Sequence, residues 1–407
     1  MPESVTAVKV TAPTKLRSCA IALPPSKSVV NRLLILDPDL SVTDNACEDI
    51  KVMKKAVAII AKANHSPLEL HLKSSGTAMR FITALCAVTD GVWFLTGDTR
   101  QYERPVKPLV DALRSAGANI EYAGKEGFPP LIIKGSSSLP GGEIEIDGSQ
   151  SSQFISALML IADKFVHKLK INITGEKNST PYIALTRELV KEFKGLRGQK
   201  FKGSRDQGVK GIEADWSAAA FWYEIMAISG VIFDLEGLNP SSHQGDRIIE
   251  HLINEIIHHP SSITHNLKDT PDIVQPLIVT CCMLGVPFRF TGVMNLRIKE
   301  TDRLHALQTE LQKLGYAIEV EDDAISWKGN ASTNIHPLNS ASTPLQLPLN
   351  SPSINPHHDH RMAMSFAPCA LKLGSIVIED PDVVGKSYPT FWDDLRKAGF
   401  EVQPYLQ

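Results

Sequence analysis

The chain has 407 residues, of which 43% are hydrophobic and 21% are charged, and its formal net charge is −3. This length exceeds one ordinary hydrophobic core and predicts two domains, and this charge gives no global reason to expect nucleic acid or an anionic membrane as a partner. The N-terminal sequence MPESVTAVKV lacks the cationic and apolar regions of a signal peptide, and no apolar run approaches the roughly 18 residues of a membrane helix, so we expect a cytoplasmic protein.

Six apolar segments predict buried helices, because they have helical length and are apolar on nearly every side. In chain order they span residues 29–36, 76–88, 151–163, 217–229, 272–284 and 360–373. Each leads into a short run of β-branched or aromatic residues that ends in Gly, Asp or Asn, as expected for a strand entering a turn. These predicted strands span residues 41–45, 93–98, 171–176, 233–238, 288–293 and 376–381, and the first is the weakest copy.

A second pattern, found in residues 111–121, 309–319 and 393–403, joins a helix end, a glycine and a new strand. Three positions align at identical offsets: Leu113, Leu311 and Leu395; Gly117, Gly315 and Gly399; Ile120, Ile318 and Val402. A glycine after a helix can adopt the left-handed conformation that closes it. The two patterns together predict a repeated α/β unit, with three copies to a domain.

The six predicted helices open with polar, small or charged residues, which read PPSKS, SSGT, SQSSQ, ADWS, DTPD and HHDH. A helix N-terminus has unpaired N–H groups and partial positive charge, so it favours anions. Ordinary N-capping explains any one of these openings. It does not explain the six cations beside the buried helices, which are Lys27, Arg32, Arg80, Lys299, Arg303 and Arg361.

The roles of two carboxylates and two cations in the C-terminal half can each be interpreted in two ways. Asp269 and Asp272 are either helix caps or, among lysines and arginines, ionised groups that act as a base or hold a hydroxyl. Lys299 and Arg303 share one face if both are helical, and they would repel each other unless an anion lies between them.

The cluster His357, His358, Asp359 and His360 suggests a metal site as a rival interpretation. We discount it, because consecutive residues cannot readily all point at one metal and no distant Cys or His partners accompany them. The six cysteines form no C-x-x-C pair, which indicates reduced, mostly buried thiols.

Ten motifs between residues 23 and 400 occur in the order found in one known family. They read PPSKSVVNR, SSGTAMRF, ERPVKPLVDAL, DGSQSSQF, STPYI, QGD, DTPD, NLRIKETDRL, DHRMAM and GKSYP. On these motifs the chain resembles the enolpyruvyl transferases and, within them, the EPSP synthase family.

The resemblance implies an α/β fold of two similar domains, each with three repeated βαβαββ-like units whose helices lie inside and whose sheets lie outside. It places an N-terminal lobe at residues 23–214 and a C-terminal lobe at residues 1–22 and 215–407, with hinges near Leu23 and Ala214. Closure of the lobes would exclude water from the reaction. The stretches 52–74, 192–210 and 248–267 are shorter than is usual for the family.

The resemblance also implies roles for individual residues. The positions that match phosphoenolpyruvate binding are Lys27, Gly76, Thr77, Arg104, Gln153, Arg303, Arg361 and Lys386. Those that match shikimate 3-phosphate binding are Lys27, Ser28, Arg32, Ser151, Ser152, Gln153, Ser179, Tyr182, Asp272, Asn295 and Lys299. The catalytic set is Glu300 as proton donor, Lys27 and Asp272 in proton transfer, and His360.

The implied reaction moves the enolpyruvyl group of phosphoenolpyruvate to the 5-hydroxyl of shikimate 3-phosphate and releases phosphate, a step of chorismate and aromatic amino acid biosynthesis. This reaction needs an acid, a base and fixed positive charge. The resemblance implies that it uses no metal and no cofactor. It also implies a monomer that binds neither nucleic acid nor a membrane.

One enzymatic alternative is a UDP-N-acetylglucosamine enolpyruvyl transferase, for which we would expect a loop cysteine near Arg104 and no DHRMAM motif. A non-catalytic anion-binding homologue is another, but pure anion binding has no use for Asp272 and Glu300.

Overall fold

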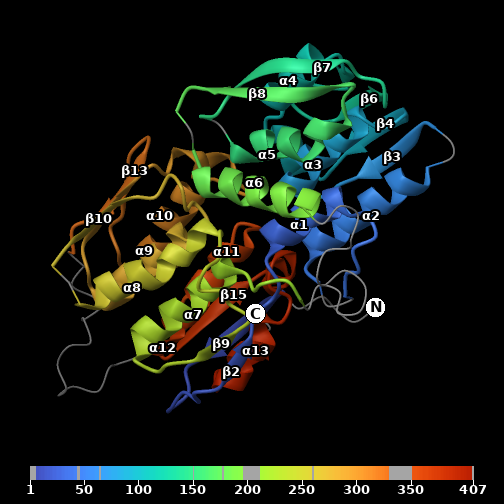
Figure 1. Ribbon diagram of the computed structural model, residues 1–407. Helices are drawn as coiled ribbons and strands as arrows, with labels where there is room; N and C mark the ends of the chain where they lie inside the picture. Colours follow the sequence, from blue (N-terminus) through green and yellow to red (C-terminus); the bar gives the residue numbers. More distant parts are fainter. Residues whose placement is uncertain are drawn as a thin grey trace. The chain divides into compact units, whose positions relative to one another are not determined.

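The computed structural model describes residues 6–43, 46–63, 66–149, 151–176, 178–195, 211–258, 261–329 and 351–405. The chain divides into two compact units (Figure 1). One is Pro25–Glu213, here called the inserted unit, and the other is Met1–Pro24 with Ala214–Gln407, here called the terminal unit.

The inserted unit alternates helices and short strands. Its helices are α1 (Lys27–Leu36), α2 (Glu48–Lys62), α3 (Gly76–Ala87), α4 (Lys107–Ser115), α5 (Ser152–Ile161) and α6 (Thr180–Gly195). Its strands are β3 (Leu68–His71), β4 (Gly91–Thr96), β5 (Asn119–Tyr122), β6 (Leu131–Gly135), β7 (Gly141–Asp147) and β8 (His167–Thr174), and short 3₁₀ turns lie at Thr99–Glu103 and Ala162–Lys164.

The terminal unit alternates in the same way. Its helices are α7 (Trp216–Ser229), α8 (Ile249–His258), α9 (Val274–Leu284), α10 (Arg303–Lys313), α11 (His360–Phe366), α12 (Ala370–Leu373) and α13 (Phe391–Ala398). Its strands are β1 (Ala7–Thr11), β2 (Ala20–Ala22), β9 (Asp234–Glu236), β10 (Ile263–Asn266), β11 (Phe288–Thr291), β12 (Glu319–Val320), β13 (Ala324–Trp327), β14 (Ser353–Ile354), β15 (Ser375–Glu379) and β16 (Glu401–Pro404). The 3₁₀ turns η4 (Gly245–Ile248), η5 (Met294–Ile298), η6 (Ala367–Cys369) and η7 (Pro381–Lys386) connect them.

Three four-stranded sheets share one pairing pattern. Their strand orders are β3-β4-β6-β5 in the inserted unit, and β10-β11-β13-β12 and β14-β15-β1-β16 in the terminal unit. In each sheet the first pair is parallel and the other two pairs are antiparallel. Each unit also has one parallel strand pair, β7 with β8 and β2 with β9. The described part of the chain is therefore an α/β protein whose strand pairing recurs.

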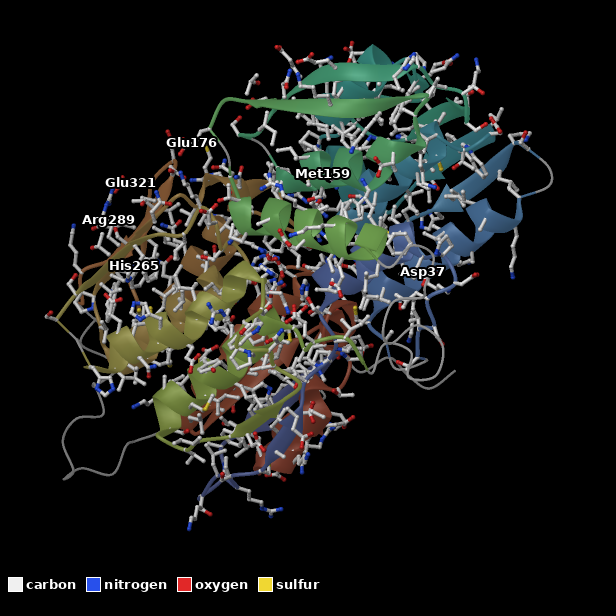
Figure 2. The ribbon with its side chains drawn as sticks, viewed as in Figure 1. Asp37, Met159, Glu176, His265, Arg289 and Glu321 are labelled. Atoms are coloured by element: carbon white, nitrogen blue, oxygen red, sulfur yellow. The ribbon has the colours of Figure 1, made fainter. Side chains whose placement is uncertain are left out.

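The helices predicted as buried form the core of each unit. In α3 eleven of twelve residues are buried, and α5 lies between β8 and α6 (Figure 1). In the terminal unit α9 packs against α7 and α11. On the sheet of β10, β11, β13 and β12 the exposed side chain of Arg289, on the inner strand β11, pairs with the exposed Glu321, which follows the edge strand β12 (Figure 2). These helices are apolar on nearly every side because nearly every side is buried.

The three predicted helix ends are confirmed at the level of single hydrogen bonds. The glycines have φ of 99° at Gly117, 86° at Gly315 and 108° at Gly399. The residue after each glycine donates to the carbonyl of the aligned leucine: Ala118 to Leu113 at 2.9 Å, Tyr316 to Leu311 at 3.0 Å and Phe400 to Leu395 at 3.0 Å. This 6→1 bond defines a Schellman end, and the buried leucine anchors it to the core.

Two predicted elements differ from the structure. Residues 41–43 form no strand, and Asp44 and Asn45 lie outside the described residues. Ser and Thr favour local bonds to the backbone, and Val42 is the single apolar residue of the predicted strand. The predicted helix at 360–373 is interrupted by η6, because Pro368 cannot donate the hydrogen bond that would continue α11.

The cysteines and the helix lengths agree with the sequence-based expectations. Five cysteines are buried and Cys19 is half-buried, and all six are thiols. Among the described residues no helix is both long and apolar enough to cross a membrane. Of the short stretch 192–210, residues 196–210 lie outside the described residues.

Candidate functional site

In the inserted unit, helix α1 begins at the first predicted site residue. Lys27 is its first residue, and its Nζ lies 3.1 Å from Oδ2 of Asp49 on α2. Both side chains are largely shielded, with 15% and 8% exposure. Asp49 was not predicted, because a pairing between two helices cannot be read from either segment alone. The carboxylate of Asp49 holds the lysine head in place.

Arg32, one turn further along α1, is buried among neutral groups. Its guanidinium donates to Thr186 Oγ1 at 2.7 Å, to the Ser28 carbonyl at 2.8 Å and to Ser156 Oγ at 3.1 Å. It also donates to the Tyr182 carbonyl and lies over the Tyr182 ring. Burial lowers the pKa of Arg32 to about 10, and no carboxylate among the described residues pairs with it. Arg32 therefore ties three helices together and gathers the predicted Ser28 and Tyr182 around a buried positive charge.

Arg104 lies against the start of α3, as the Gly76 prediction requires. A Cβ built on Gly76 would meet Arg104 Nη2 at 2.5 Å, so only glycine leaves room for the guanidinium there. Arg104 Nη1 donates to the Ser74 carbonyl at 3.3 Å. Within the described part of the chain Arg104 forms no ion pair, and its buried Nε has no hydrogen-bond partner. The buried guanidinium and the helix N-terminus are both positive, so this place favours the binding of an anion.

Arg80 braces this arrangement, although it was noted in the sequence only as a cation near a helix. Its Nη1 donates to the Gly76 carbonyl at 3.1 Å and its Nη2 to the Pro105 carbonyl at 2.9 Å. One buried side chain therefore joins the SSGT loop to the loop of Arg104. The signal that could have found this role is its position four residues after Gly76, on the same helix face.

The predicted neutral groups lie at the starts of α5 and α6. Ser151 caps α5 by accepting from the Gln153 N–H at 3.3 Å, and Gln153 Nε2 donates to Thr77 Oγ1 at 3.1 Å. Ser152 is buried in the first turn of α5, and Ser179 precedes α6 with φ of 54°. The contact with Thr77 brings the starts of α3 and α5 together.

In the terminal unit, one buried arginine joins three carboxylates. Arg303 contacts Asp359 at 2.7 Å, Glu300 at 3.0 Å and Asp272 at 3.1 Å. Burial alone would lower the pKa of Arg303, but these three carboxylates outweigh it and raise the pKa above its ordinary value. Asp359 was not predicted as a partner, since it appeared in the sequence only within the histidine cluster.

Two further cations complete this group. Arg361 Nη2 lies 3.2 Å from Asp272 Oδ2, and Lys386 Nζ lies 3.3 Å from Glu300 Oε1. Asp272 and Glu300 are therefore each held by two cations. We call the six side chains Asp272, Glu300, Arg303, Asp359, Arg361 and Lys386 the Arg303 cluster. Asp272 is not a helix cap, because the residue in the cap position of α9 is Ile273.

The predicted site residues Lys299, Asn295 and His360 also belong to the terminal unit, and the conformation predicted for Lys299 differs from the structure. Lys299 lies between η5 and α10, and α10 begins at Arg303, so the predicted shared helix face is wrong. The 3₁₀ turn η5 ends at Ile298, and the four non-helical residues 299–302 separate it from α10. Asn295 lies in η5, and His360 is the buried first residue of α11.

The histidine cluster disperses to different partners. His357 lies 2.8 Å from Glu310, His358 lies 3.1 Å from Asp380, and Asp359 bonds Arg303. Among the described residues no group of three or more His, Cys, Asp or Glu side chains could hold a metal.

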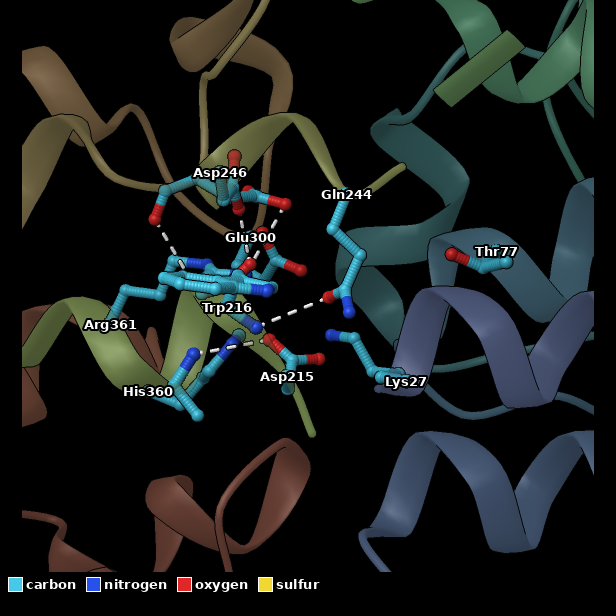
Figure 3. Close-up of polar contacts among 12 residues, drawn as sticks. Lys27, Thr77, Asp215, Trp216, Gln244, Asp246, Glu300, His360 and Arg361 are labelled. Atoms are coloured by element: carbon cyan, nitrogen blue, oxygen red, sulfur yellow. Dashed lines mark hydrogen bonds and ion pairs between the residues drawn. The ribbon is translucent and has the colours of Figure 1, made fainter. Parts of the chain in front are cut away.

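A neighbouring pair was missed by the sequence analysis although the QGD motif was noted. Gln244 Oε1 accepts from the Trp216 N–H at 3.2 Å, and Gln244 Nε2 donates to the Ala214 carbonyl at 2.9 Å (Figure 3). Asp246 accepts a hydrogen bond from the Ser217 hydroxyl.

Comparison with known proteins gives one consistent result. The family model of EPSP synthase (3-phosphoshikimate 1-carboxyvinyltransferase) matches residues 20–395. A 3-phosphoshikimate 1-carboxyvinyltransferase of Bacteroides fragilis is 39% identical, with 96% of this chain and 98% of the relative covered. One of Methanospirillum hungatei is 34% identical, with 92% and 94% covered. The solved EPSP synthase of Acinetobacter baumannii shares the fold with a TM-score of 0.67 at 20% identity, covering 98% of this chain and 100% of that one.

Proposed function

The chain belongs to the EPSP synthase family, and from that premise we propose that it transfers the enolpyruvyl group of phosphoenolpyruvate to the 5-hydroxyl of shikimate 3-phosphate. The products are phosphate and 5-enolpyruvylshikimate 3-phosphate, in aromatic amino acid biosynthesis. The names of the relatives favour this reaction over transfer to a UDP-sugar. No second function is favoured by the residues described.

The observation that carries the proposal is the Arg303 cluster, where two partly accessible carboxylates are each held by two cations. Asp272 is 22% exposed and Glu300 is 12% exposed, whereas Arg303 and Asp359 are closed to solvent. Cations that already attract carboxylates can attract the phosphate and carboxylate groups of a substrate. When an anionic ligand binds these cations, they stabilise the charge of the carboxylate less, so the carboxylate binds a proton more readily. This property suits a general acid or base.

In the proposed mechanism, Glu300 delivers the proton to C3 of phosphoenolpyruvate and Asp272 accepts the proton of the attacking hydroxyl. Arg303, Arg361 and Lys386 would stabilise the negative charge of the donor while the tetrahedral adduct forms. The adduct would then lose phosphate from C2 and one proton from C3, which returns to Glu300, and the vinyl group is regenerated. We also assign a part in proton transfer to Lys27, and we retain His360 in the catalytic set as a buried neighbour of Arg361. These roles follow the motif positions and are supported by the contacts described above.

The groups of the inserted unit would bind the same two substrates. Arg104, Gly76, Thr77 and Gln153 suit the donor, because a buried unpaired guanidinium and amide donors surround the start of α3. Shikimate 3-phosphate would be held by Lys27, Ser28, Arg32, Ser151, Ser152, Ser179 and Tyr182, and by Asp272, Asn295 and Lys299 of the terminal unit. Arg32 would contribute mainly through its charge, since most of its N–H groups already bond protein atoms.

Several finer points belong to the same proposal. We propose that residues 23–214 and residues 1–22 with 215–407 are the two lobes of the family fold, each with three repeated βαβαββ-like units. The recurring strand order supports this description. The cytoplasmic location and monomeric state expected from the sequence are likewise proposed, and sedimentation measurements would test the monomer.

A phosphate-release assay tests the function directly. Purified protein that shows a cooperative melt is given phosphoenolpyruvate with shikimate 3-phosphate, and in parallel phosphoenolpyruvate with UDP-N-acetylglucosamine. We expect phosphate release with the first pair and none with the second. Folded protein that turns over neither pair, or only the second, would contradict the proposal.

A further inference from the structure

A buried glutamine lies between the two loops that meet at Arg104 and has no role in the reaction so far. Gln101, in the 3₁₀ turn η1 (Thr99–Glu103), is 0% exposed. Its Nε2 donates to the Ser75 carbonyl at 2.8 Å, whereas its Oε1 is buried and has no hydrogen-bond partner among the described residues. A buried acceptor without a donor destabilises a folded protein, so this amide calls for a reason other than stability.

Three successive carbonyls ahead of α3 accept hydrogen bonds from residues 98–104. The Lys73 carbonyl accepts from the Asp98 N–H at 3.2 Å, the Ser74 carbonyl from Arg104 Nη1 at 3.3 Å, and the Ser75 carbonyl from Gln101 Nε2 at 2.8 Å. In a 3₁₀ turn, side chains three residues apart lie on the same side. Gln101 and Arg104 have this spacing, and they reach neighbouring carbonyls of the loop that begins α3.

The guanidinium of Arg104 makes few contacts of its own. Within the described part of the chain it donates one hydrogen bond, to the Ser74 carbonyl, and its backbone N–H donates to the Gln101 carbonyl at 3.2 Å. A single long bond fixes a flexible arginine side chain weakly. The position of this charge beside Gly76 therefore depends on how firmly η1 is held against the start of α3.

The Ser75 carbonyl does not need the hydrogen bond from Gln101. It also accepts the Met79 N–H at 3.0 Å, which is an ordinary helical bond of α3. Methionine has a side chain of similar length and adapts to irregular gaps in a core. Gln101→Met would leave the Ser75 carbonyl with a donor and would remove the unpartnered Oε1. Stability alone therefore favours an apolar residue at this position.

We propose that Gln101 is a positioning residue for Arg104. Its bond to the Ser75 carbonyl fixes η1 and so keeps the guanidinium at the N-terminus of α3, where both positive charges attract one anion. Gln101 acts on the ligand only through Arg104. The inference rests on the proposed function, because it takes phosphoenolpyruvate as that anion.

The test compares wild type with Gln101→Met by phosphate release, with each substrate varied while the other is saturating. The net contribution of one hydrogen bond corresponds to a rise of roughly three- to tenfold in KM for phosphoenolpyruvate. KM for shikimate 3-phosphate should stay within about twofold, and the melting temperature should equal or exceed that of wild type. A partly unfolded sample would lower the apparent kcat and leave both KM values unchanged. Gln101→Leu takes the place of Gln101→Met should that variant not fold.

Gln308→Met is the matched control. Gln308 on α10 donates from Nε2 to the Ile318 carbonyl at 2.9 Å, so the same substitution removes the same kind of bond in the terminal unit. We expect KM for phosphoenolpyruvate to equal that of wild type. A rise equal to that of Gln101→Met would show that the effect is not specific to η1 and would overturn the inference.

The double variant Gly76→Ala with Gln101→Met tests whether Gln101 acts through Arg104. The methyl of Gly76→Ala displaces the same guanidinium, since an added Cβ would lie 2.5 Å from Arg104 Nη2. Two changes that displace one group overlap, so the combined rise in KM should be smaller than the product of the single rises. A full product would place the action of Gln101 elsewhere.

The results for wild type and for the variant separate the inference from the function beneath it. Folded wild type that releases no phosphate would remove the proposed function and the inference with it. Normal turnover by wild type, with an unchanged KM for phosphoenolpyruvate in folded Gln101→Met, would overturn the inference alone. Equal rises in KM for both substrates would likewise overturn it, because a general distortion of the inserted unit would then explain the effect.

Discussion

Arg303 donates its Nε hydrogen to Asp359 Oδ2 at 2.7 Å, and the two side chains are 1% and 0% exposed. The other oxygen of Asp359 accepts from the Arg361 N–H at 2.9 Å and so caps α11. One carboxylate therefore fixes both a buried arginine and the helix that carries the next arginine. This links the stability of the terminal unit to the geometry of the Arg303 cluster.

Asp359→Ala should destabilise the protein strongly. It leaves Arg303 buried with less compensation and removes the cap of α11, and breaking a buried pair in this way costs about 3 kcal/mol or more. Urea unfolding at neutral pH measures the loss. The matched control is Arg289→Ala, whose exposed pair with Glu321 should contribute nothing measurable. Equal midpoints for the two variants would refute this account of Asp359.

Glu300→Gln should spare ligand binding and nearly abolish turnover. The amide keeps the shape of the side chain and can still contact Arg303 and Lys386, but it cannot donate a proton as the acid does. We expect kcat to fall by roughly 10²- to 10⁴-fold. Isothermal titration with shikimate 3-phosphate reports binding, and Glu321→Gln on the exposed sheet edge is the control. An unchanged kcat together with weakened binding would assign Glu300 to substrate holding alone.

Gly76→Ala should weaken use of phosphoenolpyruvate more than use of shikimate 3-phosphate. The added methyl would lie 2.5 Å from Arg104 Nη2, so the guanidinium must move away from the start of α3. A displaced charged hydrogen-bond donor commonly costs about 1.5–3 kcal/mol, and we expect KM for phosphoenolpyruvate to rise by about tenfold or more. Gly195→Ala, which meets nothing within 4 Å, is the control. Similar KM values for both variants would show that Arg104 tolerates the methyl.

Glu224→Gln should stabilise the protein increasingly as pH rises. Glu224 is fully buried in α7, neither carboxyl oxygen has a partner among the described residues, and burial raises its pKa well above the ordinary value. Above the unfolded pKa of about 4.3 the unfolded chain releases this proton while the folded protein keeps it, so wild type loses about 1.4 kcal/mol per pH unit until the folded pKa is reached.

Urea unfolding at about pH 4.5 and about pH 7.5 checks this sign, since the variant has no proton to release there. The difference between variant and wild type should be small at the lower pH and large at the higher one. Glu250→Gln, on the exposed side of α8, should show no such trend. A difference that is constant with pH would mean that Glu224 is ionised in the folded protein.

Local features could be predicted from the sequence with residue accuracy. The three glycine ends were predicted correctly because a Schellman end depends on a few consecutive residues, such as Leu113, Gly117 and Ala118. The predicted strand at 41–45 failed over 41–43 because strand formation also needs a partner, which the segment itself cannot reveal.

The cations of the site were predictable, but their partners were not. Lys27, Arg303 and Arg361 were noted because each lies beside a predicted buried helix, whereas Arg104 was implied only by the family resemblance. Asp49, Asp359 and Asp246 become visible only when separate helices pack, since their pairings join residues that are not neighbours in sequence. Lys299 was misplaced for the related reason that the end of η5 and the start of α10 are set by tertiary contacts.

The position of β1 has a consequence for biosynthesis on the ribosome. This strand lies between β15 and β16, and the Tyr405 N–H bonds the Ala7 carbonyl. The sheet of β1 therefore cannot be completed until β15 and β16 have been synthesised. Pro25–Glu213 is synthesised between β1 and these two strands, so it can fold during translation while the terminal unit still lacks them.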